Sequence, residues 1–314
     1  MDRVVISGSG LLTGHGRQLD LHSGQRVLIE PFSLHAQLGD KALRRLDRVS
    51  EMAVSVVSDA LIEAKLPLKF ETEMATQTAA YFATGFGNLQ GTFNFLERLQ
   101  QKGARFCNPV DFPNLVLSAP VGALSIQFGI KGELLAFSQG TLSVLQALNT
   151  ACAKITEHEA QVAIVCGADE HHQVVVDPAQ NQQLLVAVGE GAGALVLVDE
   201  SATDSRICVA ASALSGCDGE AGLSEVLDQI SLQSGFTKFD GVIAPKHHHE
   251  FVSHQVKTER MIDLRAIVGC FETVAAISLS FAFRCIKEDR SKVWVVIEEE
   301  AESGAAAVVL AGVQ

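Results

Sequence analysis

The sequence predicts an α/β fold made of two related halves. Short apolar segments that read as strands alternate with longer segments whose apolar residues recur at helical spacing. Five segments before residue 200 have counterparts in the same order after residue 205, a pattern that indicates an internal duplication. We expect residues 1–205 and 206–314 to form the two halves of one compact unit, the second half being shortened.

The clearest unit lies at residues 132–155. Apolar residues 134–137 predict a strand, residues 138–140 a tight turn, and Leu142 begins a helix with almost no charge on any face. A helix that is apolar all round is typical of a protein interior. The turn places Thr141 at the helix start, where the helix dipole and free backbone N–H groups favour developing negative charge.

Apolar runs, glycines and prolines define the rest of the first half. Glycines after an N-terminal strand at 3–7 predict a loop that stays close to neighbouring backbone. Asp40 is expected to cap a long amphipathic helix. Two prolines require a loop at 107–113, and the uncharged residues 114–127 predict a helix despite Pro120. The remaining elements are strands at 79–84, 162–168 and 194–198 and a helix at 91–100.

The glycine-rich residues 188–193 do not predict a nucleotide site. A phosphate-binding fingerprint places its glycines between a strand and a following helix. Here the glycines lead into residues 194–198, which read as a strand. We therefore do not expect nucleotide binding.

The second half repeats the elements of the first. The deletions that shorten it fall mainly at 222–240 and around 247–263. The matched pairs are 206–210 with 3–7, 241–244 with 81–84, 268–286 with 141–155, 293–297 with 162–166, and 303–310 with 190–197.

Composition limits the class of partner. The 314 residues are 47% hydrophobic and carry a formal net charge of −13, which argues against nucleic acid as the main partner. No uninterrupted apolar run is as long as the about 20 residues that a membrane-spanning helix needs. The seven cysteines form no CxxC pair, and the N-terminal residues lead straight into a strand, so we expect reduced thiols, no secretory signal and a cytoplasmic location.

Six segments, taken in order, resemble the β-ketoacyl synthase family of the thiolase fold over essentially the whole chain. They are RVVISGSGLLT, LRRLDRVSEMAVSVVSDAL, NPVDFPNLVLSAPVGALSIQFGIKGE, SQGTLSVLQAL, AIVCGADE and VGEGAGALVLV. The resemblance implies two stacked βαβαβαββ halves in αβαβα layers. It also implies a homo- or heterodimer formed through the strand and helix of the first half.

The same resemblance implies that the catalytic residues are missing. Active family members use a cysteine at the turn, then two histidines, or a histidine and an asparagine, in the second half. Here Thr141 stands at the cysteine position, and Pro245 and Cys270 stand at the histidine positions. Residues 302–305 replace the family's late Gly-Phe-Gly-Gly segment. A threonine without an adjacent base is a poor nucleophile, so we expect no condensation by this chain, no catalytic residue and no cofactor.

Two groups of residues have competing interpretations. Cys270 is either a relocated nucleophile or a small buried thiol that fills the place of an imidazole, and we favour the latter. The run His247-His248-His249 is either a metal site or a polar surface loop. Three consecutive residues on a strand cannot all face one ion, so we expect a surface loop there, as at His171-His172, and no metal.

The sequence is similar in its logic to chain-length factors, the catalytically silent members of the family. Its shortened second half further resembles the compact ketosynthase-like proteins of aryl polyene biosynthesis. We expect a non-condensing subunit that forms a heterodimer with an active β-ketoacyl synthase and shapes its acyl tunnel. Acyl carrier protein is expected to bind mainly through the partner. The alternatives are a divergent acyltransferase or decarboxylase using Thr141 or Cys270, and a homodimeric acyl-binding scaffold.

The resemblance also implies where the partner's tunnel is met. In the family, the helix around residues 114–122 lies at the dimer contact and reaches toward that tunnel. One face of it is expected either to stop the growing chain or simply to pack in the dimer. The residues concerned are Asn114, Leu117, Ser118 and Val121, with Phe112 adding bulk.

Overall fold

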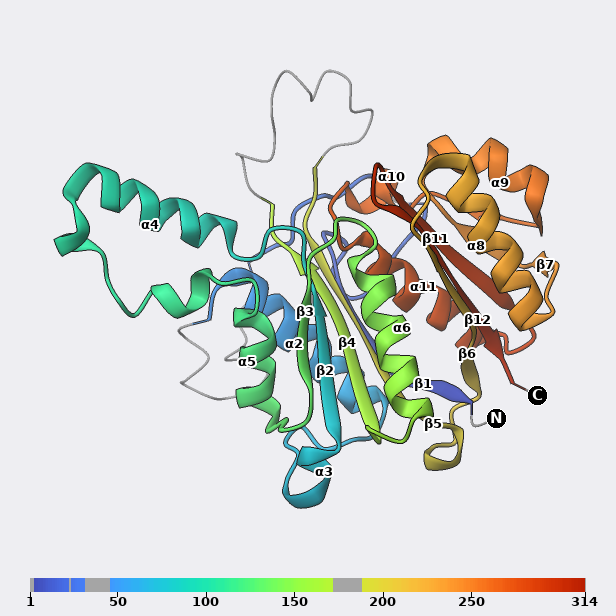
Figure 1. The fold of residues 1–314 in the computed structure, drawn as a ribbon, viewed down its shortest axis with the longest axis horizontal. Helices are drawn as coiled ribbons and strands as arrows, with labels where there is room; N and C mark the ends of the chain where they lie inside the picture. The colour runs from blue at the N-terminus through green and yellow to red at the C-terminus, as the bar shows by residue number, and fades with distance from the viewer. Residues whose placement is uncertain (1–2, 23, 32–45, 172–187, 314) are drawn as a thin grey trace.

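The computed structural model describes residues 3–22, 24–31, 46–171 and 188–313, which form a large sheet with helices on both faces (Figure 1). Within these residues, β7 (Lys238–Phe239) and β9 (Lys257–Thr258) make a separate small pair. The ten strands of the large sheet are β1 (Val4–Leu12), β2 (Thr78–Ala83), β3 (Leu134–Phe137), β4 (Val162–Asp169), β5 (Gly191–Asp199), β6 (Ile207–Ser215), β8 (Gly241–Ile243), β10 (Met261–Ile262), β11 (Val293–Glu300) and β12 (Gly304–Gly312).

The strand order confirms the duplication. From its outer edge inwards, the first half runs β3-β2-β4-β5-β1 and the second half runs β10-β8-β11-β12-β6. In each half the first three strands are parallel, and the next two add in antiparallel fashion. The halves meet where β1 lies beside β6, through the pair Val5 and Cys208.

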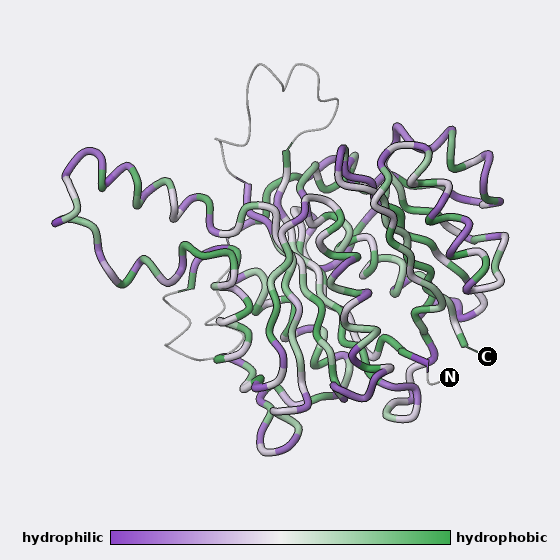
Figure 2. The backbone as a smooth tube through the Cα atoms, viewed as in Figure 1, coloured by the Kyte–Doolittle hydropathy of each residue, from purple (hydrophilic) through white to green (hydrophobic). Residues whose placement is uncertain are grey.

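Helices cover both faces of the sheet, and the one at Gly219–Ser234 was not predicted from the sequence. α2 (Arg48–Glu63) and α5 (Ala119–Phe128) pack on the outer face of the first half, and α8 (Gly219–Ser234) packs on that of the second. α6 (Ser143–Thr156) and α11 (Val274–Glu288) lie between the halves, and each contacts strands of both (Figure 1). The layers are therefore α-β-α-β-α. Figure 2 shows that apolar residues concentrate in these central strands and helices.

β1 is longer than predicted, because Gly8 and Gly10 belong to the strand rather than to a loop. A Cβ atom on either glycine would collide with the backbone carbonyl of Ala60 or of Val56 in α2. The two glycines thus let α2 approach β1 closely. The prediction of close backbone approach was right, and the prediction of a loop was wrong.

Two helix starts also differ from the predictions. α2 begins at Arg48, where the Asp47 side chain accepts a hydrogen bond from the Ser50 N–H at 2.9 Å; Asp40 lies outside the described residues. α5 begins at Ala119 rather than at residue 114, with Pro120 in its first turn. Proline is tolerated there because the first-turn N–H groups have no partner within the helix, so Pro120 starts this helix instead of interrupting it.

The expectation that α6 is buried all round is wrong. Its buried side includes Val144, Leu148 and Ile155, whereas the opposite side carries Gln146 and Thr150, which are half-exposed. The prediction relied on the absence of charged residues, but these two residues are polar although uncharged. α6 is amphipathic within this chain.

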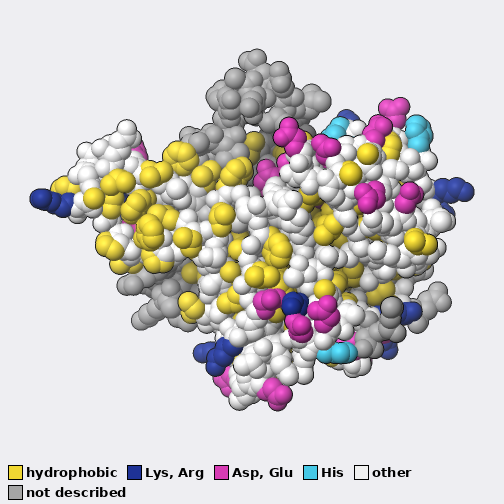
Figure 3. Space-filling view, in the orientation of Figure 1, with side chains coloured by type: hydrophobic (Ala, Val, Ile, Leu, Met, Phe, Trp, Pro, Cys, Tyr) yellow, Lys and Arg dark blue, Asp and Glu magenta, His cyan; other side chains and the backbone are white. Residues whose placement is uncertain are grey.

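An arm formed by α4 (Leu89–Lys102) and the residues after it extends away from the sheet (Figure 1). No residue of α4 is buried, and apolar side chains gather over the arm in Figure 3. Among the described residues, no helix combines the length and apolar character needed to cross a bilayer. The shorter helical elements are α3 (Thr72–Thr76), η2 (Ala104–Phe106), η3 (Phe112–Leu115), η4 (Glu200–Ala202), η5 (Lys246–His248), α9 (His249–Gln255) and α10 (Arg265–Val268).

Candidate functional site

The turn between β3 and α6 has the predicted form. β3 ends at Phe137, Gly140 adopts a left-handed conformation with φ of +54°, and α6 begins at Ser143. The Ser143 hydroxyl donates to the Gly140 carbonyl at 2.7 Å and accepts from the Gln139 N–H at 2.7 Å, which fixes the turn. Thr141 is thereby held at the start of the helix, half-buried.

Both polar groups of Thr141 are already engaged by the end of β11. Its backbone N–H donates to Glu300 Oε2 at 2.7 Å, and its hydroxyl donates to the Glu299 carbonyl at 2.9 Å. An N–H group at a helix start stabilises negative charge on a substrate only while it is unoccupied. In this chain a carboxylate of the protein itself takes that position.

A run of three glutamates, Glu298 to Glu300, forms the centre of the site. Glu298 is buried and forms an ion pair with Arg265, which is buried as well. Glu299 lies beside His248, and Glu300 holds the N–H of Thr141. This run was not predicted from the sequence, although three acidic residues at the end of an apolar strand are an unusual signal that could have revealed it.

Cys270 lies near the same run, next to Arg265. Burial raises the pKa of the Cys270 thiol, and the nearby Arg265 guanidinium opposes that shift only in part. The backbone carbonyl of Cys270 accepts from the Gly189 N–H at 3.0 Å. A half-buried thiol with a raised pKa is protonated at neutral pH, and this state is a poor nucleophile.

Pro245, which the resemblance places at one of the family's histidine positions, is buried directly before η5. The histidines after it do not form a simple surface loop: His247 is exposed, but His248 is buried and faces Glu299. Burial and the neighbouring His247 lower the pKa of His248. The other histidine pair is described only in part, since His171 is half-buried and His172 lies outside the described residues.

Two more acids lie beside this site, Asp169, which is buried, and Glu272, which is half-buried. Asp169, at the end of β4, accepts hydrogen bonds from the Thr84 hydroxyl at 2.8 Å and from the Thr273 N–H at 3.0 Å. Thr273 directly precedes α11. Burial raises the pKa of Asp169. Burial, followed by repulsion from Glu300, raises the pKa of Glu272 to about 7. The site is therefore acidic, and its carboxylates accept hydrogen bonds from groups of the same chain.

The expected tunnel residues do not share a helix face. Asn114 lies in the 3-10 helix η3, while Leu117 and Ser118 precede α5, so only Val121 lies in α5. Val121 is 4% exposed and belongs to the core of this chain, whereas Phe112, Leu117 and Ser118 are exposed. The structure thus brings three of the five residues to the surface at the base of the arm.

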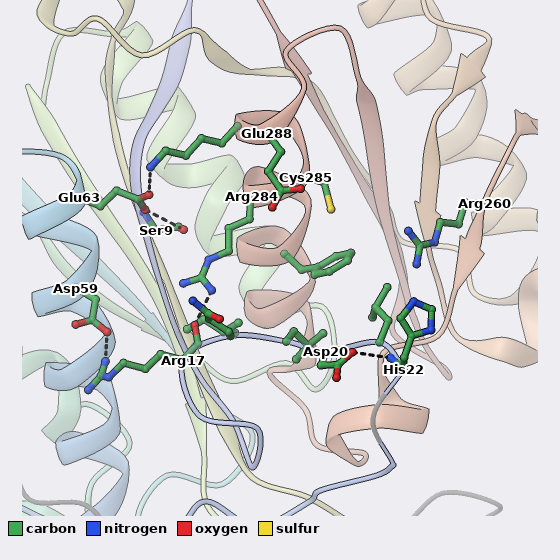
Figure 4. A pocket seen from close by; sticks show the side chains of 16 residues that line it. Ser9, Arg17, Asp20, His22, Asp59, Glu63, Arg260, Arg284, Cys285 and Glu288 are labelled. Atoms are coloured by element: carbon green, nitrogen blue, oxygen red, sulfur yellow. Dashed lines mark hydrogen bonds and ion pairs between the residues drawn. The ribbon is translucent and has the colours of Figure 1, made fainter.

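A cavity of about 910 Å³ lies elsewhere, between β1, α2 and α11 (Figure 4). Many of the side chains that line it are charged, and several of them pair with one another. Arg17 pairs with Asp59, Lys287 pairs with Glu63, and Arg284 donates to the Arg17 carbonyl at 2.6 Å. These ion pairs make the cavity unsuitable for an apolar acyl chain.

Comparison with known proteins agrees with the fold. Residues 13–186 match the N-terminal domain of β-ketoacyl synthases. The 3-oxoacyl-[acyl-carrier-protein] synthase 2 of Staphylococcus aureus (strain COL) is 24% identical over 253 residues, covering 65% of this chain. The chain spans 59% of the length of that relative.

Solved structures with low sequence identity show the same fold. The ishigamide ketosynthase/chain length factor has a TM-score of 0.82 at 17% identity, covering 99% of this chain and 100% of that chain. A ketosynthase in complex with its chain length factor from Xenorhabdus doucetiae has a TM-score of 0.78 at 12% identity, covering 100% and 98%. The predicted thiolase-like fold is therefore confirmed. Together with the domain match over more than half of its residues, this shows that the chain belongs to the β-ketoacyl synthase family.

Proposed function

We propose that this chain is a non-condensing, chain-length-factor-like subunit that forms a heterodimer with an active β-ketoacyl synthase and shapes its acyl tunnel. The observation that carries the proposal is the contact between Thr141 and Glu300. The helix-start N–H is occupied by a carboxylate, and the Thr141 hydroxyl donates to a backbone carbonyl rather than to a base. Neither nucleophilic attack nor oxyanion stabilisation is provided for at this position.

The surface of the first half supports pairing with a partner. β3 is an edge strand in which Leu135 is 38% exposed, and an open edge favours pairing with another chain. The arm adds exposed apolar side chains that a monomer rarely presents together. They are Phe93, Leu96, Leu99, Phe106, Val110 and Phe112.

The similar structures include ketosynthases bound to chain length factors, which makes an active ketosynthase the favoured partner. We further propose that the heterodimer elongates a polyene on acyl carrier protein in the cytoplasm, and that the carrier protein binds mainly to the partner. The shortened second half, which resembles proteins of aryl polyene biosynthesis, is the basis for this product class. The described residues do not favour an acyltransferase or decarboxylase, because burial raises the pKa of the Cys270 thiol and the Thr141 hydroxyl donates to a backbone carbonyl.

Co-purification with a ketosynthase tests the proposal. The chain is co-expressed with a tagged ketosynthase that retains the cysteine and both histidines, and each protein is also assayed alone with malonyl- and acyl-carrier protein. We expect a stable complex that elongates, and no ketoacyl product from this chain alone. Elongation by the isolated chain, or failure to form the complex, would contradict the proposal.

Substitution of Leu117 tests the tunnel role. Leu117 is 43% exposed at the base of the arm, so Leu117→Ala removes bulk without opening a cavity in the core. If this side chain stops the growing acyl chain, the heterodimer carrying Leu117→Ala makes a longer product than the wild type, as measured by mass spectrometry. Leu232→Ala, at an exposed leucine of α8 in the second half, is the matched control. Equal product lengths for both variants would refute the tunnel role of Leu117.

A further inference from the structure

His247, His248 and Glu299 form a cluster of potential metal ligands that the proposed function does not use. The two histidines come from η5 and the glutamate from the end of β11, so the cluster joins segments far apart in the sequence. One ligand atom of each residue lies within 4.8 Å of those of the other two. The two imidazole rings are 3.9 Å apart between centroids.

His248 carries a buried nitrogen that lacks a hydrogen-bond partner. Its Nε2 lies 3.3 Å from Glu299 Oε2, yet among the described residues no group makes a hydrogen bond with it. His248 is only 9% exposed, and an unsatisfied buried polar atom is costly. His248 Nε2 and Glu299 Oε2 thus face each other without a hydrogen bond between them. Two atoms that bind one metal ion are arranged in the same way.

Neighbouring contacts hold the ligands in place. Glu299 Oε1 accepts from the Gly219 N–H at 3.0 Å, which leaves Oε2 directed at His248. His249 Nε2 lies 3.0 Å from the Ala244 carbonyl oxygen, which fixes the start of α9 and engages the third histidine elsewhere. Outer contacts of this kind orient the ligands in protein metal sites.

The geometry points to a Zn²⁺ site formed by His247, His248 and Glu299. Two imidazoles and one carboxylate are a known Zn²⁺ ligand set, in which water completes the coordination. Tetrahedral ligand atoms about 2.0 Å from zinc are about 3.3 Å from each other. The His247 side chain is exposed beside the His248 ring, so its rotation can close the remaining separation, and water reaches the ion from the same side.

This inference replaces the expected polar surface loop. A surface loop was predicted on the assumption that the three histidines lie on a strand, where neighbouring side chains point to opposite faces. They lie instead in a tight turn that leads into a helix, and the carboxylate comes from β11. The site is independent of the proposed pairing with a ketosynthase, although Glu299 also accepts from the Thr141 hydroxyl through its backbone carbonyl.

Metal binding by the purified chain tests the inference. The chain is stripped with a chelator, titrated with Zn²⁺ by calorimetry, and analysed for retained zinc by atomic emission after gel filtration. We expect saturable binding of one Zn²⁺ per chain. His247→Ala and Glu299→Gln are each expected to weaken binding by more than about tenfold, as loss of a ligand or of its support does in known sites.

His254→Ala is the matched control, because it removes an exposed histidine from α9 outside the cluster. We expect it to bind Zn²⁺ as the wild type does. His247 is exposed, so His247→Ala keeps the test valid even if changes at the buried His248 impair folding. Absence of saturable binding, or equal affinity for His247→Ala and the wild type, would overturn the site while leaving the ketosynthase pairing untouched.

Discussion

The Glu300 carboxylate dominates the chemistry around Thr141. It accepts the N–H group at the start of α6 and also contributes to the raised pKa of Glu272. A thiol placed at residue 141 would therefore sit beside negative charge. A nearby anion raises a thiol pKa, in contrast to the lowered pKa that catalytic cysteines require.

Thr141→Cys is accordingly expected to react slowly with iodoacetamide at neutral pH. The double variant Thr141→Cys/Glu300→Gln is expected to react about tenfold faster, since removal of one close like charge lowers a pKa by about one unit. Peptide mass spectrometry gives the rate at residue 141, with the exposed Cys217 as an internal control. Equal rates at residue 141 in the two variants would show that Glu300 does not control this position.

Glu272 makes stability depend on pH. Its pKa is raised from 4.5 to about 7, mainly by burial, so between these values the folded chain keeps a proton that the unfolded chain has lost. This contribution to stability therefore falls as the pH rises through that window. Glu272→Gln is expected to raise the free energy of unfolding by about 1–2 kcal/mol at about pH 8 and to change it little at about pH 4.

Urea denaturation at the two pH values measures this difference. Glu220→Gln, at an exposed glutamate in the first turn of α8, is the control and should leave the pH dependence unchanged. The same gain in stability at both pH values would show that a packing change, rather than the titration of Glu272, is responsible.

The sequence could place Thr141 because a strand, a tight turn and an apolar helix follow one another directly. It could not reveal Glu300, which lies 159 positions away and meets Thr141 only through the packing of the two halves. The same limit applies to His248 and Glu299. Contacts between distant segments depend on tertiary structure, which local patterns do not encode.

The arm carried by α4 is the clearest unpartnered element. Leu96 is 51% exposed on this helix, which has no buried residue in the described chain. Leu96→Glu is therefore expected to change the free energy of unfolding by less than about 0.5 kcal/mol, yet to abolish co-purification with the ketosynthase. Leu232→Glu on α8, where Leu232 is 87% exposed, should leave co-purification intact.

Pull-down with the tagged ketosynthase and urea denaturation of each variant measure the two effects separately. Retained pairing by Leu96→Glu would exclude the arm from the interface. A large loss of stability would instead show that Leu96 supports the fold of this chain.

Elements were predicted well where apolar periodicity is strong and less well where glycine or proline has two possible roles. β2, β4 and α4 were found close to their predicted positions. Gly10 was read as a loop residue although it lies in a strand against Val56. Pro120 was read as lying inside a helix that begins at residue 114, although it stands in the first turn of α5. Glycine marks both loops and close approaches, and proline marks both loops and helix starts, so only packing distinguishes these roles.

The two halves depend on each other for burial. α6 contacts β2 and β4 in the first half and β12 in the second, and α11 likewise contacts β5 and β11. A fragment of residues 1–205 would expose the side of α6 that now packs against the second half. We expect that fragment to lack a cooperative unfolding transition and to bind a hydrophobic dye, as loosely packed states do.

Thermal unfolding followed by circular dichroism, compared with the full chain, checks this expectation. A fragment that unfolds cooperatively would mean that the halves are separate domains. The boundary at residue 205 remains a prediction, as does the view that both halves form one unit.

The placement of Glu300 has a consequence for how such a chain can evolve. Under the proposed function, a single codon change that restored cysteine at residue 141 would yield a thiol whose ionisation is opposed by the adjacent carboxylate. Selection would gain nothing from that step alone, since a second change at residue 300 is needed before the thiol becomes useful. Under the proposed function, the Glu300 carboxylate therefore opposes the gain of condensing activity through a change at residue 141 alone.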